Sequence, residues 1–479
     1  MRARPFVLLT LLPILVAHSQ NSSTRLSGMG NISIAVVDSE SEVFSNPAKA
    51  SWLGTGLLRF SPFYSGTSND YSYNDNPGVA GYSPSTSSQS LSDRQYNLPV
   101  GVIIPVSNFR FGGAASLGRM TDHQESKTWT GGTSPSSSNN TQDVKNPSKA
   151  LSLMGSMDLG WGSIGVAGSW GSNSEEIDYL DNYPLSTLSY SYENVYTEDQ
   201  TNHVYTFGLL FGPRETAQVS LMVGIEGNHL EMKPTRAVSN GIPQDLSLPD
   251  ISLQSETGTR FEGEVRKSYE GNVLAALRVS YRTSSNDQSE KYQWPTGPTL
   301  PVYMERPTGH TDEHAWRLGF GISKQVEGTG IFSAEYVYSP TGINDKSYYT
   351  MAGTTADGRT YVPGQESSTT DETVNIQEIR VGIELRLLPE LIARGGAEVM
   401  WANDEYTSRS LSYSETTTMS GRTAAQFYGA GGLSYYVGPV RIDYSFGMVP
   451  YSWYNYSSPY STQALDIALQ HTATVSYQF

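Results

Sequence analysis

The 479-residue sequence has no cysteine, comparatively few basic residues and no long apolar segment. Without cysteine, the chain cannot be a disulfide-stapled secreted domain or a lipoprotein, so its stability must come from the fold alone. Its 31 basic residues are outnumbered by 47 acidic ones, for a formal net charge of −16. This balance argues against nucleic acid and anionic lipid as partners. No segment reaches the roughly 20 apolar residues of a membrane-spanning helix.

The N-terminus has the pattern of an export signal. Arg2 and Arg4 precede the apolar run PFVLLTLLPILVA, and small residues follow at Ala17 and Ser19. A basic start, a short apolar core and a small-residue site are typical of a cleaved secretory signal. We therefore predict that residues 1–19 are a signal peptide.

A two-residue alternation runs to the last residue of the chain. In LDIALQHTATVSYQF, residues 465–479, every second side chain is apolar or aromatic apart from one histidine, and similar alternation recurs over 440–448 and 378–387. A period of two places successive side chains on opposite faces of a strand. Segments of about 9–11 such residues can cross a membrane as tilted strands. The two faces would then meet lipid and a barrel lumen.

The connections between these segments alternate between short and long. Short connections lie at Ser107–Asn108, Gly212–Glu215, Leu388–Glu390 and Gly438–Pro439, whereas residues 172–200 are an example of a long polar stretch. Outer-membrane barrels have short periplasmic turns and long external loops. The sequence thus predicts an all-β, antiparallel up-and-down transmembrane barrel of about 14–16 strands over residues 54–479. We place it in a bacterial outer membrane, with both termini periplasmic.

The end of the chain favours this barrel over a soluble β-sandwich, which would also alternate. Val475, Tyr477 and Phe479 place apolar or aromatic side chains at every second position up to a terminal phenylalanine. This ending resembles the recognition signal of proteins that the outer-membrane assembly machinery inserts. Closing a barrel also requires the last strand to pair with the first over its full length.

Before the first expected strand, Leu57–Tyr64, lies RLSGMGNISIAVVDSESEVFSNPAKASWLGTG. This stretch resembles the N-terminal segment of the FadL-like outer-membrane transporters of hydrophobic compounds, including the PorV-type barrels of the same superfamily. The matching residues are Gly28, Gly30, Ala35, Asp38, Asn46, Pro47 and Ala48. The sequence departs from the pattern at Ser33, where relatives often have alanine, and at Lys49, where they usually have glycine.

The resemblance implies that residues 20–53 form a plug inside the barrel. It also implies passive uptake of hydrophobic small molecules, such as long-chain fatty acids or aromatic hydrocarbons, without a cofactor. The expected partners are outer-membrane lipid, a hydrophobic ligand and the assembly machinery. Two alternatives remain: a PorV-like anchor or shuttle for secreted proteins, and a porin-like channel for small polar solutes.

The residue chemistry of the segment is compatible with a plug. Gly28 and Gly30 permit close approach of the backbone to the wall. Pro47 keeps Asn46 extended, and the Asn46 side chain can bond to the backbone in a turn.

Charged residues of both signs occupy inward-facing positions. They are Arg59, Asp158, Glu226, Arg278, Arg317, Glu335, Glu378, Arg380, Glu384, Arg386, Arg394, Glu398, Arg441 and Asp443. They could line a polar path, but we favour ion pairs that stiffen the wall and hold the plug, because an unpaired buried charge is costly. Among them, Arg386, Arg394 and Arg441 lie next to short turns.

The plug segment carries acidic residues that suit these three arginines. Asp38, Glu40 and Glu42 lie just before Asn46-Pro47-Ala48. We predict plug–wall ion pairs between the two groups, with Asp38 contacting at least one of Arg386, Arg394 and Arg441.

One string resembles an enzyme motif. His310 to His314 reads HTDEH and matches the zinc-peptidase pattern H-x-x-E-H. That chemistry needs a helix, and the alternation here predicts a strand. We therefore expect no catalytic site, no metal and no cofactor.

Overall fold

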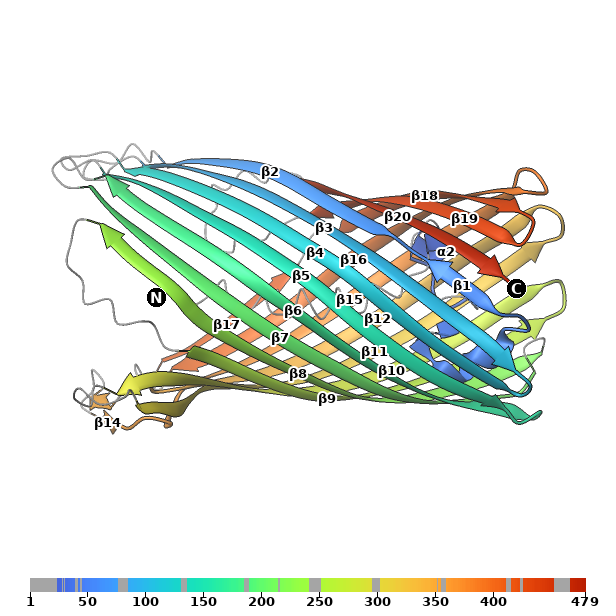
Figure 1. Cartoon of the computed structure of the whole chain (residues 1–479), viewed down its shortest axis with the longest axis horizontal. Helices are drawn as coiled ribbons and strands as arrows, with labels where there is room; N and C mark the ends of the chain where they lie inside the picture. The colour runs from blue at the N-terminus through green and yellow to red at the C-terminus, as the bar shows by residue number, and fades with distance from the viewer. Residues whose placement is uncertain are drawn as a thin grey trace.

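The computed structural model describes residues 24–479 except 28, 30, 39–41, 44, 76–84, 131–135, 185–188, 214–215, 241–250, 295–301, 351, 355–358, 411–414, 423–424 and 452–465. The described strands form an antiparallel barrel (Figure 1). The predicted signal peptide and three of the predicted plug residues, Gly28, Gly30 and Glu40, lie outside the described residues.

The wall is a single sheet whose strands follow one another in chain order. They are β1 (Leu57–Phe60), β2 (Phe63–Asp75), β3 (Ser85–Val106), β4 (Phe109–Thr130), β5 (Ser136–Asp158), β6 (Gly162–Pro184), β7 (Ser189–Phe211), β8 (Ala217–Asn240), β9 (Ile251–Tyr269), β10 (Val273–Trp294), β11 (Val302–Val326), β12 (Gly330–Tyr348), β15 (Glu366–Arg386), β16 (Leu391–Ser410), β17 (Glu415–Arg422), β18 (Gln426–Val437), β19 (Val440–Tyr451) and β20 (Asp466–Gln478). Because β1 continues into β2, and β17 into β18, the barrel has 16 strands. This confirms the predicted fold.

The first and last strands close the barrel. β1 and β2 pair with β20 on one side and with β3 on the other. Beyond the ladder, Gly56 and Phe479 exchange two backbone hydrogen bonds of 2.8 and 3.1 Å. The alternation to the final residue therefore serves a strand that is paired to its end.

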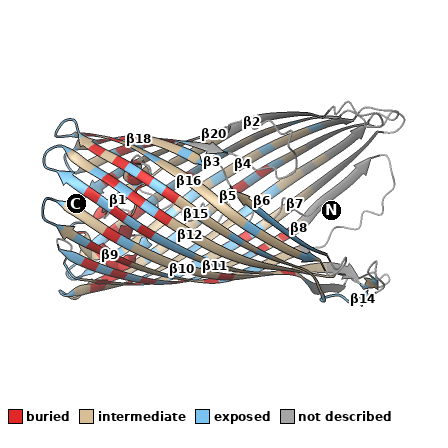
Figure 2. Cartoon of the chain, turned by 180° about the vertical axis from the view of Figure 1, so that it is seen from behind, coloured by how far each residue is buried: buried red, intermediate tan, exposed pale blue. Residues whose placement is uncertain are grey.

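The alternation places apolar side chains outside and charged ones inside. On β15, Ile379 and Val381 are 46% and 48% exposed, whereas Glu378 and Arg380 are 8% and 7% exposed. Residues buried on the inner face gather in the half of the barrel that carries the C-terminus (Figure 2). The apolar outer belt and the polar lumen match the prediction of a membrane barrel.

The strands are much longer than the predicted crossings. β6 and β7 each have 23 residues and include most of residues 172–200, which the sequence suggested were a loop. Serine, threonine and tyrosine sustain backbone pairing here, but both faces are polar, so no hydrophobic alternation marks the strands. The wall thus extends well beyond the apolar belt.

Short turns form one rim of the barrel. They include the predicted turns and two that the sequence did not single out, at 270–272 and 327–329. At the first of these, Gly271 and Asn272 have φ values of 79° and 58°, which favour glycine and asparagine. The C-terminus and α2 (Thr24–Ser27) lie at the same end of the barrel (Figure 1).

Smaller elements complete the described structure. These are η1 (Pro47–Trp52), a 3₁₀ helix, and the hairpin of β13 (Gly353–Thr354) and β14 (Thr360–Tyr361). None of the helices in the described part of the chain is long and apolar enough to span a membrane. The HTDEH string lies within β11, so its two histidines are on a strand rather than a helix.

Candidate functional site

The described residues from 24 to 53, here called the inner segment, lie against the lumenal face of the wall. Apolar side chains of this segment are buried there in small clusters. Val43, Ala50 and Leu53 pack with Leu57 and Ile103 of the wall. Ile34 packs with Ala276 and Val337. The contacts come from opposite sides of the barrel, so the segment crosses the lumen near the short-turn rim.

The Asn46-Pro47-Ala48 motif begins the helix η1. Asn46 is extended, with φ −127° and ψ 106°, and its side chain accepts a hydrogen bond from the backbone N–H of Ala48 at 3.1 Å. Pro47 occupies the first turn, where its missing N–H costs nothing. Both features agree with the residue chemistry expected from the sequence.

Two glycines of the wall make room for this motif. Gly165 of β6 and Gly208 of β7 are cross-strand partners. A Cβ at Gly165 would lie 2.4 Å from the backbone nitrogen of Ala48, and one at Gly208 would lie 2.1 Å from the side-chain oxygen of Asn46. Ser163 donates a 2.7 Å hydrogen bond to the Ala48 carbonyl. The motif therefore fits a recess that larger residues would fill.

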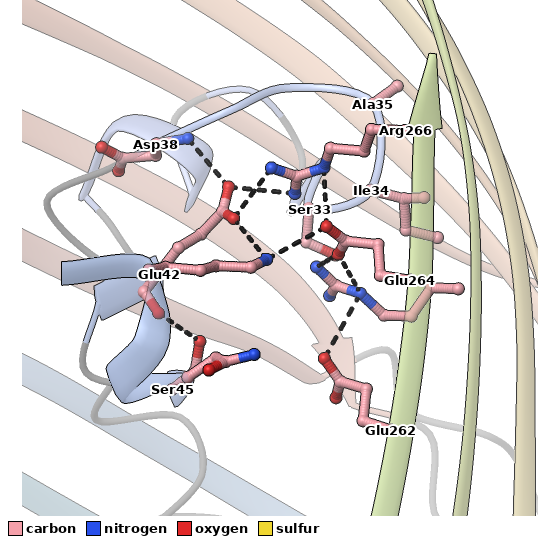
Figure 3. A network of polar contacts seen from close by, with 12 residues as sticks. Ser33, Ile34, Ala35, Asp38, Glu42, Ser45, Glu262, Glu264 and Arg266 are labelled. Atoms are coloured by element: carbon pink, nitrogen blue, oxygen red, sulfur yellow. Dashed lines mark hydrogen bonds and ion pairs between the residues drawn. The ribbon is translucent and has the colours of Figure 1, made fainter. Parts of the chain in front are cut away.

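A buried cluster of charges fixes η1 to β9 and β10 (Figure 3). Lys49 lies 2.8 Å from Glu42 and 3.0 Å from Glu264 of β9. Arg266 contacts both carboxylates, at 2.9 and 2.8 Å, and Arg278 of β10 donates to Glu264 at 2.9 Å. Acidic and basic groups alternate, which offsets the cost of burying them.

The surroundings of Glu42 keep its carboxyl ionised. Burial alone would raise the pKa of Glu42, but the charges of Arg266 and Lys49 outweigh it and hold the pKa below its usual value. The partners found for Glu42 are thus Lys49 and Arg266, and neither is among the three arginines named from the sequence. Arg266 lies on β9, far along the chain from those arginines.

A second contact joins the inner segment to β12. Ser33, Ile34 and Ala35 donate consecutive backbone N–H bonds to the carboxylate of Glu335. The Ser33 and Ala35 bonds measure 3.0 and 2.8 Å. The Ala35 carbonyl accepts a 2.7 Å hydrogen bond from Ser323 of β11. A run of N–H groups around one anion is a backbone nest.

A third contact lies on β15, β16 and β19. Arg25 pairs with Glu384 at 2.8 Å, and Glu384 also pairs with Arg394 at 2.7 Å. Arg394 and Arg441 both contact Asp443, at 3.2 and 2.6 Å. Two of the predicted rim arginines therefore belong to a charge cluster that reaches the inner segment through Glu384.

The predicted partner of Asp38 stays a prediction. Asp38 is buried, and its backbone N–H donates to Glu42 at 3.0 Å. Burial alone would lower the pKa of Arg25, but the charge of Glu384 and, after it, that of Asp38 raise this pKa above its usual value. Arg386, the remaining predicted partner, lies at the end of β15 and is exposed.

Sequence reasoning missed Arg25, Lys49, Glu264 and Arg266. Lys49 could have been noticed, because it stands where the resembled pattern usually has glycine. In the structure its ammonium group pairs with Glu42 and Glu264. Glu264 and Arg266 lie on β9. No local signal could have paired residues more than 200 positions apart.

Further inward charges pair across the strands of the wall, and Arg380 and Glu398 also contact Asn31 of the inner segment. Arg282 contacts Glu226 at 3.1 Å, Arg317 contacts Glu378 at 3.3 Å, and Arg380 contacts Glu398 at 3.4 Å. These contacts fit the favoured interpretation of the inward charges as ion pairs of the wall.

Comparisons with known proteins give a likeness in fold. No family model matches the chain, and no curated protein matches it. Among solved structures, it is similar to a Pseudomonas aeruginosa FadL homologue at 11% identity, covering 96% of this chain and 98% of that one, with a TM-score of 0.44. The Pseudomonas putida toluene transporter TodX shows 10% identity over 95% and 97% of the two chains, with a TM-score of 0.42.

The Ralstonia pickettii toluene transporter TbuX shows 11% identity over 95% and 96%, with a TM-score of 0.36.

Proposed function

We propose that the protein is an outer-membrane channel for passive uptake of hydrophobic small molecules, such as long-chain fatty acids or aromatic hydrocarbons. The inner segment would be its plug. The observation that carries this proposal is a segment tied to the lumenal wall at three separate places inside a barrel with an apolar outer belt. The resemblance of residues 28–48 to the transporter pattern supports it.

The contacts of the plug suit a gate. The strands of the wall pair with one another through their own backbone ladders, whereas the plug meets the wall mainly through side chains and the Glu335 nest. The plug can therefore shift without unfolding the barrel. The resemblance implies that such a shift needs no energy source.

Two observations favour other functions of the same fold. The paired charges at Arg282, Arg317 and Arg380, on β10, β11 and β15, are a poor path for an apolar molecule and would suit small polar solutes. The polar wall beyond the apolar belt offers a tall surface for protein partners. A PorV-like anchor or shuttle and a porin-like channel are therefore the alternative proposals.

Uptake of labelled oleate and toluene by cells with and without the protein tests the proposal. We expect faster uptake with the protein, and no change for a hydrophilic solute of similar size. Equal uptake of oleate and toluene in both strains would contradict a transport function and favour the anchor.

We further propose that the short-turn rim and both termini face the periplasm. Protease added to intact cells should then cut near Asn182, in the extended part of β6, and spare Ser107 and Pro389. Cleavage at Ser107 or Pro389 with the extended part intact would reverse the orientation.

A further inference from the structure

The nest formed by residues 33–35 binds its carboxylate without a cation. All three N–H groups point at Glu335, and Ser33 lies 3.0 Å from both carboxylate oxygens. Among the described residues, no basic side chain is within ion-pair distance of Glu335. The hydrogen-bond partners of this carboxylate, whose residue is only 3% exposed, are therefore the backbone N–H groups of residues 33–35.

The nest is shaped by groups other than Glu335. Asn31, with φ 61°, turns the chain into it, and Arg380 donates to the Asn31 carbonyl at 3.1 Å. On the other flank, Ser323 binds the Ala35 carbonyl. Gly321 lies beneath, where a Cβ would come within 2.8 Å of the Ala35 side chain. The nest should therefore persist when its carboxylate is exchanged.

Apolar side chains adjoin the nest. Ile34, whose N–H is part of it, packs with Ala276 of β10 and Val337 of β12, and all three are buried. A molecule that places a carboxylate in the nest would therefore place its neighbouring atoms against apolar groups. This combination suits an amphipathic carboxylate better than a small inorganic anion.

We propose that residues 33–35 are a carboxylate-binding site that Glu335 occupies in the closed state, and that an amphipathic carboxylate molecule competes with Glu335 for it. Exchange of one carboxylate for another keeps the three charge-assisted hydrogen bonds of the nest. The displaced Glu335 would lie beside its register partner on β15, Arg380, a cation that Glu378 and Glu398 already contact. Such exchange would free the inner segment from β12.

The site itself is tested by chemical rescue. In planar bilayers, we expect Glu335→Ala to raise the open fraction of the purified protein at least about tenfold, because three N–H groups lose their acceptor. Acetate should refill the nest and restore closure, whereas acetamide at the same concentration should not. Failure of acetate to restore closure, or equal rescue by acetamide, would overturn the site.

Glu335→Gln serves as the second variant, because it preserves the shape of the side chain. It should open the barrel, because a neutral amide oxygen binds the N–H groups of the nest more weakly than a carboxylate does, and it should resist rescue by acetate, because the amide still occupies the nest. Closure of this variant at the wild-type level would show that charge in the nest is unimportant and would overturn the proposal.

Release by a ligand rests on the proposed uptake function and is tested separately. Dodecanoate should raise the open fraction of the wild-type protein at least about threefold, and dodecanol should not, because it has no anionic group for the nest. An equal response to both would overturn the competition. Since acetate rescue needs no hydrophobic transport, cells that fail to take up oleate would refute the uptake function while leaving the carboxylate site intact.

Discussion

The lower half of the barrel, next to the short turns, differs from the upper half, which lies beyond a band of outward-facing aromatic side chains. The same strands build both halves. The band includes Trp170, Tyr205, Tyr281 and Trp316 on the outer surface. Below it, the outer face is apolar and the lumen contains the inner segment. Above it, pairs such as Ser174 with Asp199 are exposed to solvent.

The difference shows that two kinds of interaction sustain one wall. In the lower half, each side chain has a fixed environment, either lipid or a packed lumen. In the upper half, the backbone hydrogen bonds between strands continue, but the side chains are not held in a fixed apolar or packed environment. Substitutions should therefore have large effects below the band and small effects above it.

The largest effect is expected at the C-terminus, where the lower half closes. Phe479 packs its ring over Gly56, at which a Cβ would lie 2.4 Å from the ring. Its lipid-facing area is worth only about 2 kcal/mol, yet deletion of Phe479 or Phe479→Ala should strongly reduce the amount of assembled barrel. Quantifying the heat-modifiable protein in outer membranes measures this. Normal levels with normal heat resistance would refute an assembly signal.

A pair of charge substitutions compares the two halves directly. Glu264→Gln leaves Lys49, Arg266 and Arg278 around a neutral group in the buried cluster and should cost about 3–5 kcal/mol. Asp143→Asn in the upper half breaks its 2.6 Å contact with His123, where both side chains are about half exposed, and should cost about 0–1 kcal/mol. Urea unfolding in lipid vesicles measures both. Equal losses would deny the contrast between the halves.

Two glycine substitutions sharpen the comparison within the lower half. Gly165→Ala forces a methyl group against the backbone of Pro47 and Ala48 and should cost about 1–3 kcal/mol while displacing the plug. Gly224→Ala is the matched control, since its Cβ would have no neighbour closer than 3.7 Å. We expect Gly165→Ala to increase entry of small polar antibiotics, and Gly224→Ala to leave it unchanged. If the two strains were equally sensitive to the antibiotics, Asn46-Pro47-Ala48 would not occupy the recess at Gly165.

The smallest effect is an acid dependence of the plug. Because the folded-state pKa of Glu42 lies below its ordinary value, the stabilising contribution of Glu42 is complete above the ordinary value and is lost as pH falls through the folded pKa. Conductance should therefore stay low from pH 7 to about pH 5 and rise in stronger acid. Glu42→Gln should be leaky already at pH 7 and respond less to acid. If the conductance rose on raising the pH instead, the expected direction of the pH dependence would be wrong.

Much of the fold could be predicted because strand alternation is a local property. The alternation of Ile379 and Val381 with Glu378 and Arg380 determines which face is outside wherever lipid and lumen differ. The extended parts of β6 and β7 could not be predicted in this way, because no change of solvent marks their two faces.

The candidate site was predictable only in part. The extended Asn46, the turn at Pro47 and the pairing of inward charges follow from residue chemistry. The partners of Glu42, Lys49 and Glu335 do not, since they depend on which strands face each other across the lumen.

The sequence by itself therefore determined the barrel, the side of each strand that meets lipid, and the inward position of most charges. Only the tertiary structure decided which charges meet, that Gly165 and Gly208 form a recess for Asn46-Pro47-Ala48, and that residues 33–35 enclose Glu335. The physical reason is the distance along the chain over which each property is decided. A period of two is set by neighbouring residues, whereas a buried charge is stabilised by whatever closure of the barrel brings within a few ångströms of it.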